Sequence, residues 1–394
     1  MRMHKHRAPR TARAGAPDIQ LRTARRPGYH RLSVEAGERV TDFSSDEILF
    51  ERRGAAGLIT LNRPQALNAV THAMVHALRA QLEAWANDDA VTRVVIAGAG
   101  GRAFSAGGDI RALYELGKAG QYEEALSFWR DEYPLNALIK NYRKPYVALI
   151  DGIVMGGGVG VSVHGSHRVA GDRFSFAMPE VGIGFFPDVG ATWFLPRMPG
   201  ELGTYCALTG ERFNAADSVA AGIATHRIPS ARFPALVEGL TGTVSVDAVL
   251  AAFAEPAGEG PIAARQSVID RLFAGSSVDA ILAALDAEAV SSGGDAEWAG
   301  KTAATMRTKS PLSLKLALAQ VRRGGALDFA ACMRTEFRIV SRVIHGHDFY
   351  EGVRAVIVDK DNAPRWRPAS LAEVSEAEVE RHFAARAEGE LRLP

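Results

Sequence analysis

Hydrophobic and polar positions near the start of the ordered pattern follow the spacings of strands and then of a helix. The stretch EILFERRGAAGLITLNRP (47–64) predicts two short strands joined by a glycine-containing turn and ended by Pro64. Behind it, Thr71 can cap a helix, because apolar residues then recur on one face at spacings of three and four. The residues of this inward face are Met74, Leu78, Leu82 and Trp85.

The same cycle repeats further along the chain. RVVIAGAG (93–100) and YVALIDG (146–152) predict buried strands, and between them an amphipathic pattern over 122–140 predicts a helix. A glycine-rich segment after the second strand opens another predicted helix. Strand and helix patterns alternate to about residue 230, which is typical of a layered α/β core.

Beyond this core the patterns are mainly helical, and a loop at 256–264 marks the join. We therefore predict an α/β core over 46–255 and a C-terminal helical region over 256–394. Residues 1–45 are rich in arginine and poor in acidic side chains, which predicts a basic, disordered extension. As a non-functional tail this extension fits a cytoplasmic bacterial protein, whereas as a transit peptide it would direct the chain to the mitochondrial matrix.

Composition narrows the class of protein. The chain has 394 residues, 47% of them hydrophobic, and a formal net charge of +1. This balance predicts a globular protein with no nucleic-acid partner, and no window approaches the roughly 20 apolar residues of a membrane span. Cys206 and Cys332 stand far apart without metal-ligand spacing, so we expect two buried thiols.

Two glycine-rich turns give the first indication of chemistry: AFSAGGDI (103–110) and MGGGVG (155–160). Each follows a predicted strand and precedes helical sequence. If the turns converge, each offers an unobstructed backbone N–H to one oxygen atom, and two such donors form an oxyanion hole for a reacting acyl carbonyl. Close packing of a helix on a sheet is the structural alternative, since it also favours glycine. The pattern alone leaves both open.

Other candidate groups fit known signatures poorly. Ser105 in AFSAG resembles a serine nucleophile elbow, but GAGGR interrupts the strand that should lead into it, so a serine esterase stays only as an alternative. His164 and His167 fall on the predicted glycine-rich helix, and His345 and His347 lie near the C-terminal end. None of the four forms an HExxH or comparable pattern, so we predict structural or surface roles and no metal site.

Five segments together resemble a known family. They are NRPQALNAV (62–70), AFSAGGDIRAL (103–113), KPYVALIDGIVMGGGVGVSVHGSHRVA (144–170), FAMPEVGIGFFPDVGATWFLPR (176–197) and GHDFYEGVRAVIVDKDNAPRW (346–366). The resemblance is to the enoyl-CoA hydratase/isomerase (crotonase) superfamily and covers about 46–384. The last two segments are most similar to its thioester hydrolases, which act on 3-hydroxyisobutyryl-CoA in valine breakdown. The resemblance implies a crotonase fold, which is an α/β spiral of repeated ββα units with a C-terminal helical region.

The resemblance assigns catalytic roles residue by residue. It places the two oxyanion donors on the amides of Gly108 and Gly157. Hydratases of the family carry a glutamate three residues after the second of these, where this chain has Gly160, and this departure argues against hydration. The second hydratase glutamate corresponds to Glu180, and Asp188 follows where hydratases carry glycine. Burial among apolar residues should raise at least one of these two pKa values, although both residues could instead cap loop amides.

Further residues are implied as substrate contacts. The acyl group would bind at Glu132, Gly157, Glu180 and Asp188. The coenzyme A groove would be lined by Ala66, Leu67, Asn68, Ala106, Asp109 and Ile110. Lys360 is a phosphate neighbour by analogy, with an ordinary surface lysine as the alternative.

The resemblance, together with these residues, implies an acyl-CoA thioesterase that hydrolyses 3-hydroxyisobutyryl-CoA, with 3-hydroxypropionyl-CoA as a second candidate substrate. Glu180 would attack the acyl carbon directly or activate water as a general base. We expect no cofactor or metal, an acyl-CoA partner, no nucleic acid or membrane, and a homo-oligomer such as a trimer or hexamer. Two alternatives stay open: an enoyl-CoA hydratase or isomerase, and a non-catalytic member that binds CoA or the ribosome.

Overall fold

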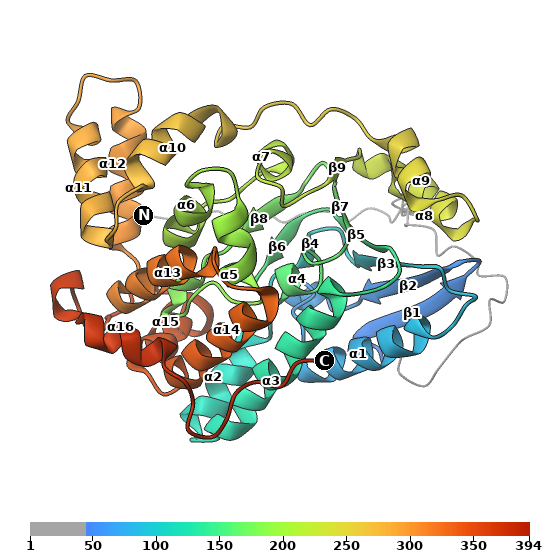
Figure 1. Cartoon of the computed structure of the whole chain (residues 1–394), viewed down its shortest axis with the longest axis horizontal. Helices are drawn as coiled ribbons and strands as arrows, with labels where there is room; N and C mark the ends of the chain where they lie inside the picture. The colour runs from blue at the N-terminus through green and yellow to red at the C-terminus, as the bar shows by residue number, and fades with distance from the viewer. Residues whose placement is uncertain (1–44) are drawn as a thin grey trace, which may run out of the picture. The chain divides into compact units, whose positions relative to one another are not determined.

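A six-stranded sheet lies at the centre of the fold (Figure 1). The computed structural model describes residues 45–394. The strands run in the order β1-β2-β3-β5-β7-β9, with β1 antiparallel to β2 and every other neighbouring pair parallel. Their bounds are β1 (Ile48–Arg53), β2 (Ala56–Leu61), β3 (Arg93–Gly98), β5 (Tyr146–Ile150), β7 (His167–Ala170) and β9 (His226–Arg227).

A second, three-stranded sheet is wholly parallel and has the order β4-β6-β8. Its strands are β4 (Ala103–Ser105), β6 (Ile153–Met155) and β8 (Ser175–Ala177). Each directly follows a strand of the large sheet in the sequence: β4 follows β3, β6 follows β5 and β8 follows β7. The chain therefore passes from the large sheet to the small one at three points, and helices lie between these points. The step from β5 to β6 needs Gly152, which has a φ of +106° and whose Cβ would lie 2.5 Å from the Arg102 carbonyl oxygen.

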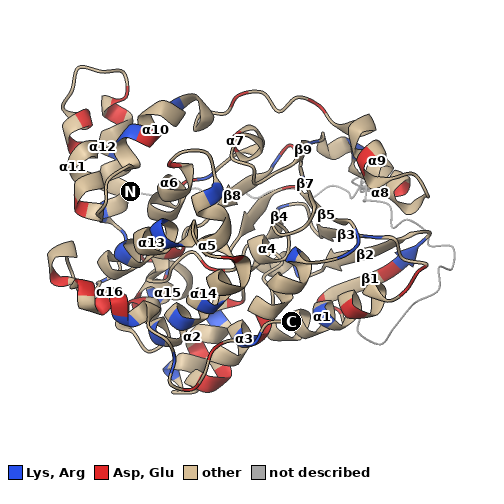
Figure 2. Cartoon of the chain, in the orientation of Figure 1, with Lys and Arg blue, Asp and Glu red and all other residues tan. Residues whose placement is uncertain are grey.

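Helices cover both sides of these sheets (Figure 1). On one side, Leu236 of α8 and Leu250 of α9 form an apolar cluster with Val95, Val147 and Val169 of the large sheet. Helix α3 packs against α1 and α14, while α13 packs against α6 and α15 against α2. Figure 2 shows basic and acidic residues interspersed along the helices, in keeping with the net charge of +1.

The helices discussed below have these bounds: α1 (His72–Ala86), α2 (Ile110–Lys118), α3 (Tyr122–Lys140), α4 (Gly157–Gly160), α5 (Ala191–Phe194), α6 (Leu202–Thr209), α8 (Phe233–Thr241), α9 (Val246–Phe253), α10 (Gln266–Phe273), α11 (Val278–Ala289), α12 (Ala296–Arg307), α13 (Pro311–Gly324), α14 (Phe329–Val343), α15 (His347–Val353) and α16 (Glu376–Phe383). From α10 onward the chain is mainly helical, as its pattern predicts, with loops over 359–370 and 384–394. Among residues 45–394, no helix is both long enough and apolar enough to cross a membrane.

Two predicted helices are confirmed in detail. Thr71 caps α1, because its Oγ1 accepts a hydrogen bond from the Met74 amide at 3.2 Å, and the predicted inward face is buried. Helix α3 has the bounds that the pattern over 122–140 predicts. The two cysteines are buried free thiols, also as predicted.

The glycine-rich helix is much shorter than the sequence suggests. Helix α4 ends at Gly160, so placing His164 and His167 on it was wrong: His164 lies in the turn that follows, and His167 begins β7. Three of the four residues of α4 are glycine, and each disfavours a helix by about 1 kcal/mol relative to alanine. The predicted extension over 1–45 falls, except for residue 45, outside the described residues.

Candidate active site

Three neighbouring strand ends position the site. Strands β4, β6 and β8 are parallel, so their carboxyl ends lie at one edge of the small sheet. Gly108 follows the end of β4 by three residues, Gly157 follows β6 by two, and Glu180 follows β8 by three. Ligands of open α/β sheets bind at such carboxyl ends. The fold therefore brings two glycine turns and one acid, from three separate segments, to the same place.

The two glycine turns touch each other. A Cβ built on Gly157 would lie 3.0 Å from the Gly108 nitrogen, and one on Gly156 would lie 3.3 Å from the Gly107 α-carbon. No side chain fits between the turns. Among residues 45–394, neither the Gly108 N–H nor the Gly157 N–H donates to a protein acceptor. Two free backbone donors thus lie side by side, which is the arrangement that an oxyanion hole requires.

The loop before α1 fixes the first of these turns. The Val70 N–H donates to the Gly107 carbonyl at 2.8 Å, and the Asp109 N–H donates to the Val70 carbonyl at 2.9 Å. The Ala106 N–H donates to the Leu67 carbonyl, also at 2.9 Å. Because the backbone is held on both sides of residue 108, the direction of its N–H is set before any ligand binds.

Glu180 and Asp188 are both buried beside these turns. Burial raises the pKa of Glu180 well above its usual value, and the nearby Asp188 adds to the rise. Burial also raises the pKa of Asp188, to about 7, although a hydrogen bond from the Tyr133 hydroxyl at 2.9 Å opposes it. One oxygen of Glu180, Oε2, has no hydrogen-bond partner among the described residues. A buried acid without a partner is a candidate for chemistry.

Helix α3 contributes a third acid to this cluster. Glu132 is 1% exposed, and its Oε1 lies 2.7 Å from the position of a Cβ on Gly157. Burial, with Asp188 and Glu336 nearby, raises the pKa of Glu132 well above its usual value. By helical spacing alone Glu132 would pass for a surface residue, but α3 is covered by both α1 and α14.

A fourth buried acid holds the chain after Asp188. The two oxygens of Glu336, on α14, accept hydrogen bonds from the Gly190 and Thr192 amides at 2.8 Å each. Burial raises the pKa of Glu336 to about 8, and Asp188 adds to the rise. Because Glu336 takes the amides at the start of α5, Asp188 does not cap this helix and its carboxylate stays directed at Tyr133.

The acid cluster makes stability depend on pH in a predictable direction. The pKa of Asp188 is about 7 in the folded chain, against about 3.9 in an unfolded one. The folded state therefore binds more protons between these values, and its free energy of unfolding falls as pH rises through the window. We expect Asp188→Asn to remove up to about 3 kcal/mol of this fall between pH 5 and 8.5, since about two pH units of the window lie below the folded pKa. Urea unfolding of both proteins across that range measures it, and parallel pH profiles would contradict the prediction.

The acids and glycines share one cavity of about 620 Å³, a volume suited to a small-molecule ligand. Its polar lining contains Gly108, Gly157, Glu132, Glu180 and Asp188. The apolar lining comes from distant parts of the chain: Phe128, Trp129, Met155, Ile183, Phe185, Val356 and Ile357. The lining is thus mainly apolar, with carboxyl groups and two backbone donors at one place.

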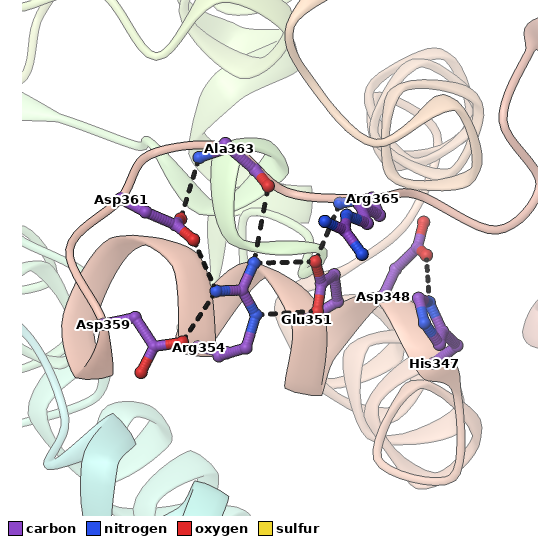
Figure 3. A network of polar contacts seen from close by, with 8 residues as sticks. All are labelled: His347, Asp348, Glu351, Arg354, Asp359, Asp361, Ala363 and Arg365. Carbon is purple, nitrogen blue, oxygen red and sulfur yellow. Dashed lines mark hydrogen bonds and ion pairs between the residues drawn. The ribbon is translucent and has the colours of Figure 1, made fainter.

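An arginine holds the outermost part of this lining in position (Figure 3). The π-helical turn Arg354–Val358 follows α15 and supplies the last two apolar residues of the cavity. Arg354 donates to Asp359 and Asp361, at 2.7 Å each, and to Glu351 at 2.9 Å. The hydrogen bond from Arg354 lowers the pKa of Glu351 to about 2, so this acid is ionised at any physiological pH.

Most of the predicted coenzyme A residues line the cavity, and one does not. Ala66, Leu67, Ala106, Asp109 and Ile110 line it. The buried Asn68 side chain instead bonds within the protein: it accepts from the Arg63 amide and donates to the Ala99 and Ala103 carbonyls. Its amide is used up in holding the loop, so a coenzyme A contact through that side chain is not available.

Sequence reasoning missed two cationic residues at the cavity. Lys309 and Arg111 both line it, whereas Lys360 is exposed and does not. Burial lowers the pKa of Lys309. Nothing in the local sequence singles out Lys309, which follows α12 and reaches the cavity only through the packing of the C-terminal helices.

The alternative groups have structural partners. Ser105 is fully buried, its hydroxyl accepts from the Gly107 amide, and no described basic side chain bonds to it. The ring of His164 contacts the Val189 carbonyl at 2.6 Å, and burial lowers its pKa to about 4. His167 pairs with Asp247 at 2.9 Å. None of these three residues lines the cavity.

Gly160 is enclosed by protein. A Cβ at this position would lie 2.7 Å from Asn136 Nδ2 and 3.0 Å from Val189 Cβ. Asn136, one turn after Glu132 on α3, is fully buried and thus fills space that a longer side chain at 160 would need. The packing around residue 160 therefore leaves no space for the side chain of an acid at this position.

Several known proteins are similar to this chain over most of its length. A family model described as enoyl-CoA hydratase/isomerase matches residues 56–383. The chain belongs to this family. A curated relative in Danio rerio, named mitochondrial 3-hydroxyisobutyryl-CoA hydrolase, is 44% identical over 92% of this chain and 96% of its own length.

Solved structures of the enoyl-CoA hydratase/isomerase family show the same architecture. A carnitinyl-CoA dehydratase from Mycobacterium thermoresistibile is 46% identical, with a TM-score of 0.83 over 88% of this chain and 99% of the other. An enoyl-CoA hydratase from Rhodobacter sphaeroides 2.4.1 is 38% identical, with a TM-score of 0.82 over 88% of this chain and 100% of the other. The predicted crotonase-type α/β fold is confirmed.

Proposed function

We propose that this chain is an acyl-CoA thioester hydrolase that cleaves 3-hydroxyisobutyryl-CoA to the free acid and coenzyme A. One observation carries the proposal: Glu180, whose Oε2 has no partner among the described residues, shares a cavity with the free N–H groups of Gly108 and Gly157, while the hydratase acid position is Gly160. The name of the curated relative in Danio rerio supports the choice of substrate.

The thioester carbonyl oxygen would bind between the Gly108 and Gly157 N–H groups. These donors stabilise the negative charge that develops on that oxygen when the carbonyl carbon is attacked. Gly157 is the first residue of α4, where backbone N–H groups have no partner within the helix, and Gly108 lies two residues before α2. Glu132, held against Gly157, closes the other side of this position.

Glu180 supplies the attack by one of two routes. In the first, its carboxylate bonds to the acyl carbon, the carbon–sulfur bond breaks, and water then hydrolyses the mixed anhydride. In the second, Glu180 takes a proton from water as the water oxygen attacks. In both routes the thiolate of coenzyme A leaves and needs a proton. Asp188, whose pKa is about 7, can hold that proton near neutral pH and donate it.

Hydration of an enoyl-CoA would need a second acid near the double bond. In hydratases of the family this acid occupies the position of Gly160, where Asn136 and Val189 now leave no room for it. The similarity to a carnitinyl-CoA dehydratase and an enoyl-CoA hydratase therefore does not decide the reaction of this chain. The buried acids that are present favour opening of the thioester.

An assay of coenzyme A release tests the proposal. We expect the purified chain to cleave 3-hydroxyisobutyryl-CoA at least about 100-fold faster than isobutyryl-CoA, because buried carboxyl groups would lose a hydroxyl partner in the second complex. 3-Hydroxypropionyl-CoA tests how much the methyl group contributes, which a pocket contact sets at about 1–3 kcal/mol. Faster hydration of crotonyl-CoA than cleavage of any 3-hydroxyacyl thioester would overturn the proposal.

Assembly and location extend the same proposal. We propose a homo-oligomer, a trimer or hexamer, in keeping with the family, and sedimentation velocity of the purified chain measures it. The relative in Danio rerio is named as mitochondrial. For this chain we propose a cytoplasmic enzyme, with the mitochondrial matrix as the alternative if residues 1–45 act as a transit peptide.

A further inference from the structure

Outside the cavity, two histidines and one aspartate come together between α1 and α3, which lie side by side (Figure 1). His72 and His76 are four residues apart on α1, so they project from the same face of that helix. Asp131 reaches them from α3, with its Oδ2 at 2.6 Å from His72 Nε2 and 3.4 Å from His76 Nε2. The two imidazole rings stack with centroids 4.5 Å apart.

We propose that His72, His76 and Asp131 bind one divalent transition-metal ion, Zn²⁺ or an ion of similar chemistry. Their three ligand atoms all lie within 4.8 Å of one another. In a tetrahedral zinc site with bonds of about 2.0 Å, ligand atoms are separated by about 3.3 Å. The distance from His76 Nε2 to Asp131 Oδ2 is 3.4 Å, close to this value. His72 Nε2 lies 2.6 Å from the same oxygen, so its ring must move outward to make room for the ion.

The chemistry of the group fits such an ion. Imidazole nitrogen and carboxylate oxygen are both zinc ligands, and one aspartate offsets part of the charge of the cation. His76 is 60% exposed, so solvent can supply the fourth ligand as water. The site could not be predicted from the sequence, because two histidines four residues apart without the glutamate of an HExxH motif are not diagnostic and the aspartate lies on another helix.

The site adjoins the loop of the active site. His72 follows Val70 by two residues, and the Val70 N–H holds the Gly107 carbonyl at 2.8 Å. The ring of His72 also packs against Phe128, with centroids 5.9 Å apart, and Phe128 lies 3.2 Å from the position of a Cβ on Gly108. A bound ion would therefore fix the start of α1 next to the loop that carries the Gly108 donor. The proposal does not depend on the reaction that the cavity catalyses.

Titration of the tag-free, EDTA-treated full chain with CoCl₂ and with ZnCl₂ tests the proposal. Visible absorption follows Co²⁺, calorimetry gives the Zn²⁺ stoichiometry, and thermal unfolding gives a readout that is separate from activity. The test variants are His76→Ala, whose exposed side chain can be removed without opening the core, and Asp131→Asn, which keeps the shape of the residue. His345→Ala, an exposed histidine outside the group, is the matched control.

We expect one ion per chain, an affinity at least tenfold lower in each test variant, and unchanged binding in the His345→Ala control. A saturating ion should raise the melting temperature of the wild type more than that of His76→Ala, because the stabilisation grows with the ratio of ion concentration to dissociation constant. Equal melting temperatures of these proteins in EDTA would show that the variants are folded. Binding that is equally tight in wild type and both test variants, or no binding at millimolar metal, would overturn the proposal.

Discussion

Replacing Glu180 with glutamine should lower the rate of thioester hydrolysis by about 10³. The amide is nearly the same size as the carboxyl, so the apolar surroundings of the residue stay packed, but it can neither attack the acyl carbon nor accept a proton from water. The loss should fall on kcat, because the two glycine donors still bind the carbonyl. Steady-state and single-turnover release of coenzyme A measure it.

Glu123→Gln is the matched control for this variant. Glu123 is 79% exposed at the start of α3, so neutralising it changes the net charge equally without touching the cavity. The control should keep wild-type kinetics, and circular dichroism should show both variants folded. Hydrolysis by Glu180→Gln within a factor of ten of the wild type would remove Glu180 from the mechanism.

A single methyl group on Gly157 should cost about 100- to 1000-fold in kcat, the range seen when one oxyanion donor is lost. The backbone of Gly157 is helical, so alanine is not excluded by its dihedral angles. The effect comes from space: the methyl carbon would lie 2.7 Å from Glu132 Oε1 and 3.0 Å from the Gly108 nitrogen. The two turns must then separate, and one oxygen atom can no longer reach both donors.

Gly294→Ala controls for the addition of a methyl group elsewhere. A Cβ at this position meets nothing within 4 Å. Its kinetics should match the wild type. If Gly157→Ala were to keep full activity in the coenzyme A assay, the two N–H groups would not be acting as a pair on the reacting carbonyl, and a different source of stabilisation would be needed.

Local periodicity was sufficient where an element depends on its own residues. Helix α1 has a capping threonine and one apolar stripe, and α3 has a long amphipathic pattern that continues past the internal Pro134, so both could be predicted from sequence. The pattern of the two glycine turns left close packing of a helix on a sheet open, and only the family resemblance assigned their amides as paired donors. Here the chemical reason and the structural reason for glycine coincide.

Features that depend on packing between distant segments could not be predicted. The burial of Glu132 and Asn136 results from the cover that α1 and α14 give to α3, which no spacing within α3 encodes. Lys309 reaches the cavity from the end of α12. The sequence around Asp188 suggests that this residue caps α5, but Glu336 accepts the Gly190 amide instead. In each case the deciding partner lies more than a hundred residues away or on another helix.

The π-helical turn Arg354–Val358 has a consequence for shortened forms of this chain. A truncated chain ending shortly before α15 would keep both glycine turns and all four buried acids. A check of the catalytic positions alone would therefore find nothing missing. It would nevertheless lack Val356 and Ile357, which form one side of the cavity. It would also lack Phe349, whose ring centroid lies 5.6 Å from that of Phe185. Bulk water would reach the acyl-binding position, and the carboxyl groups there would return towards ordinary acidity.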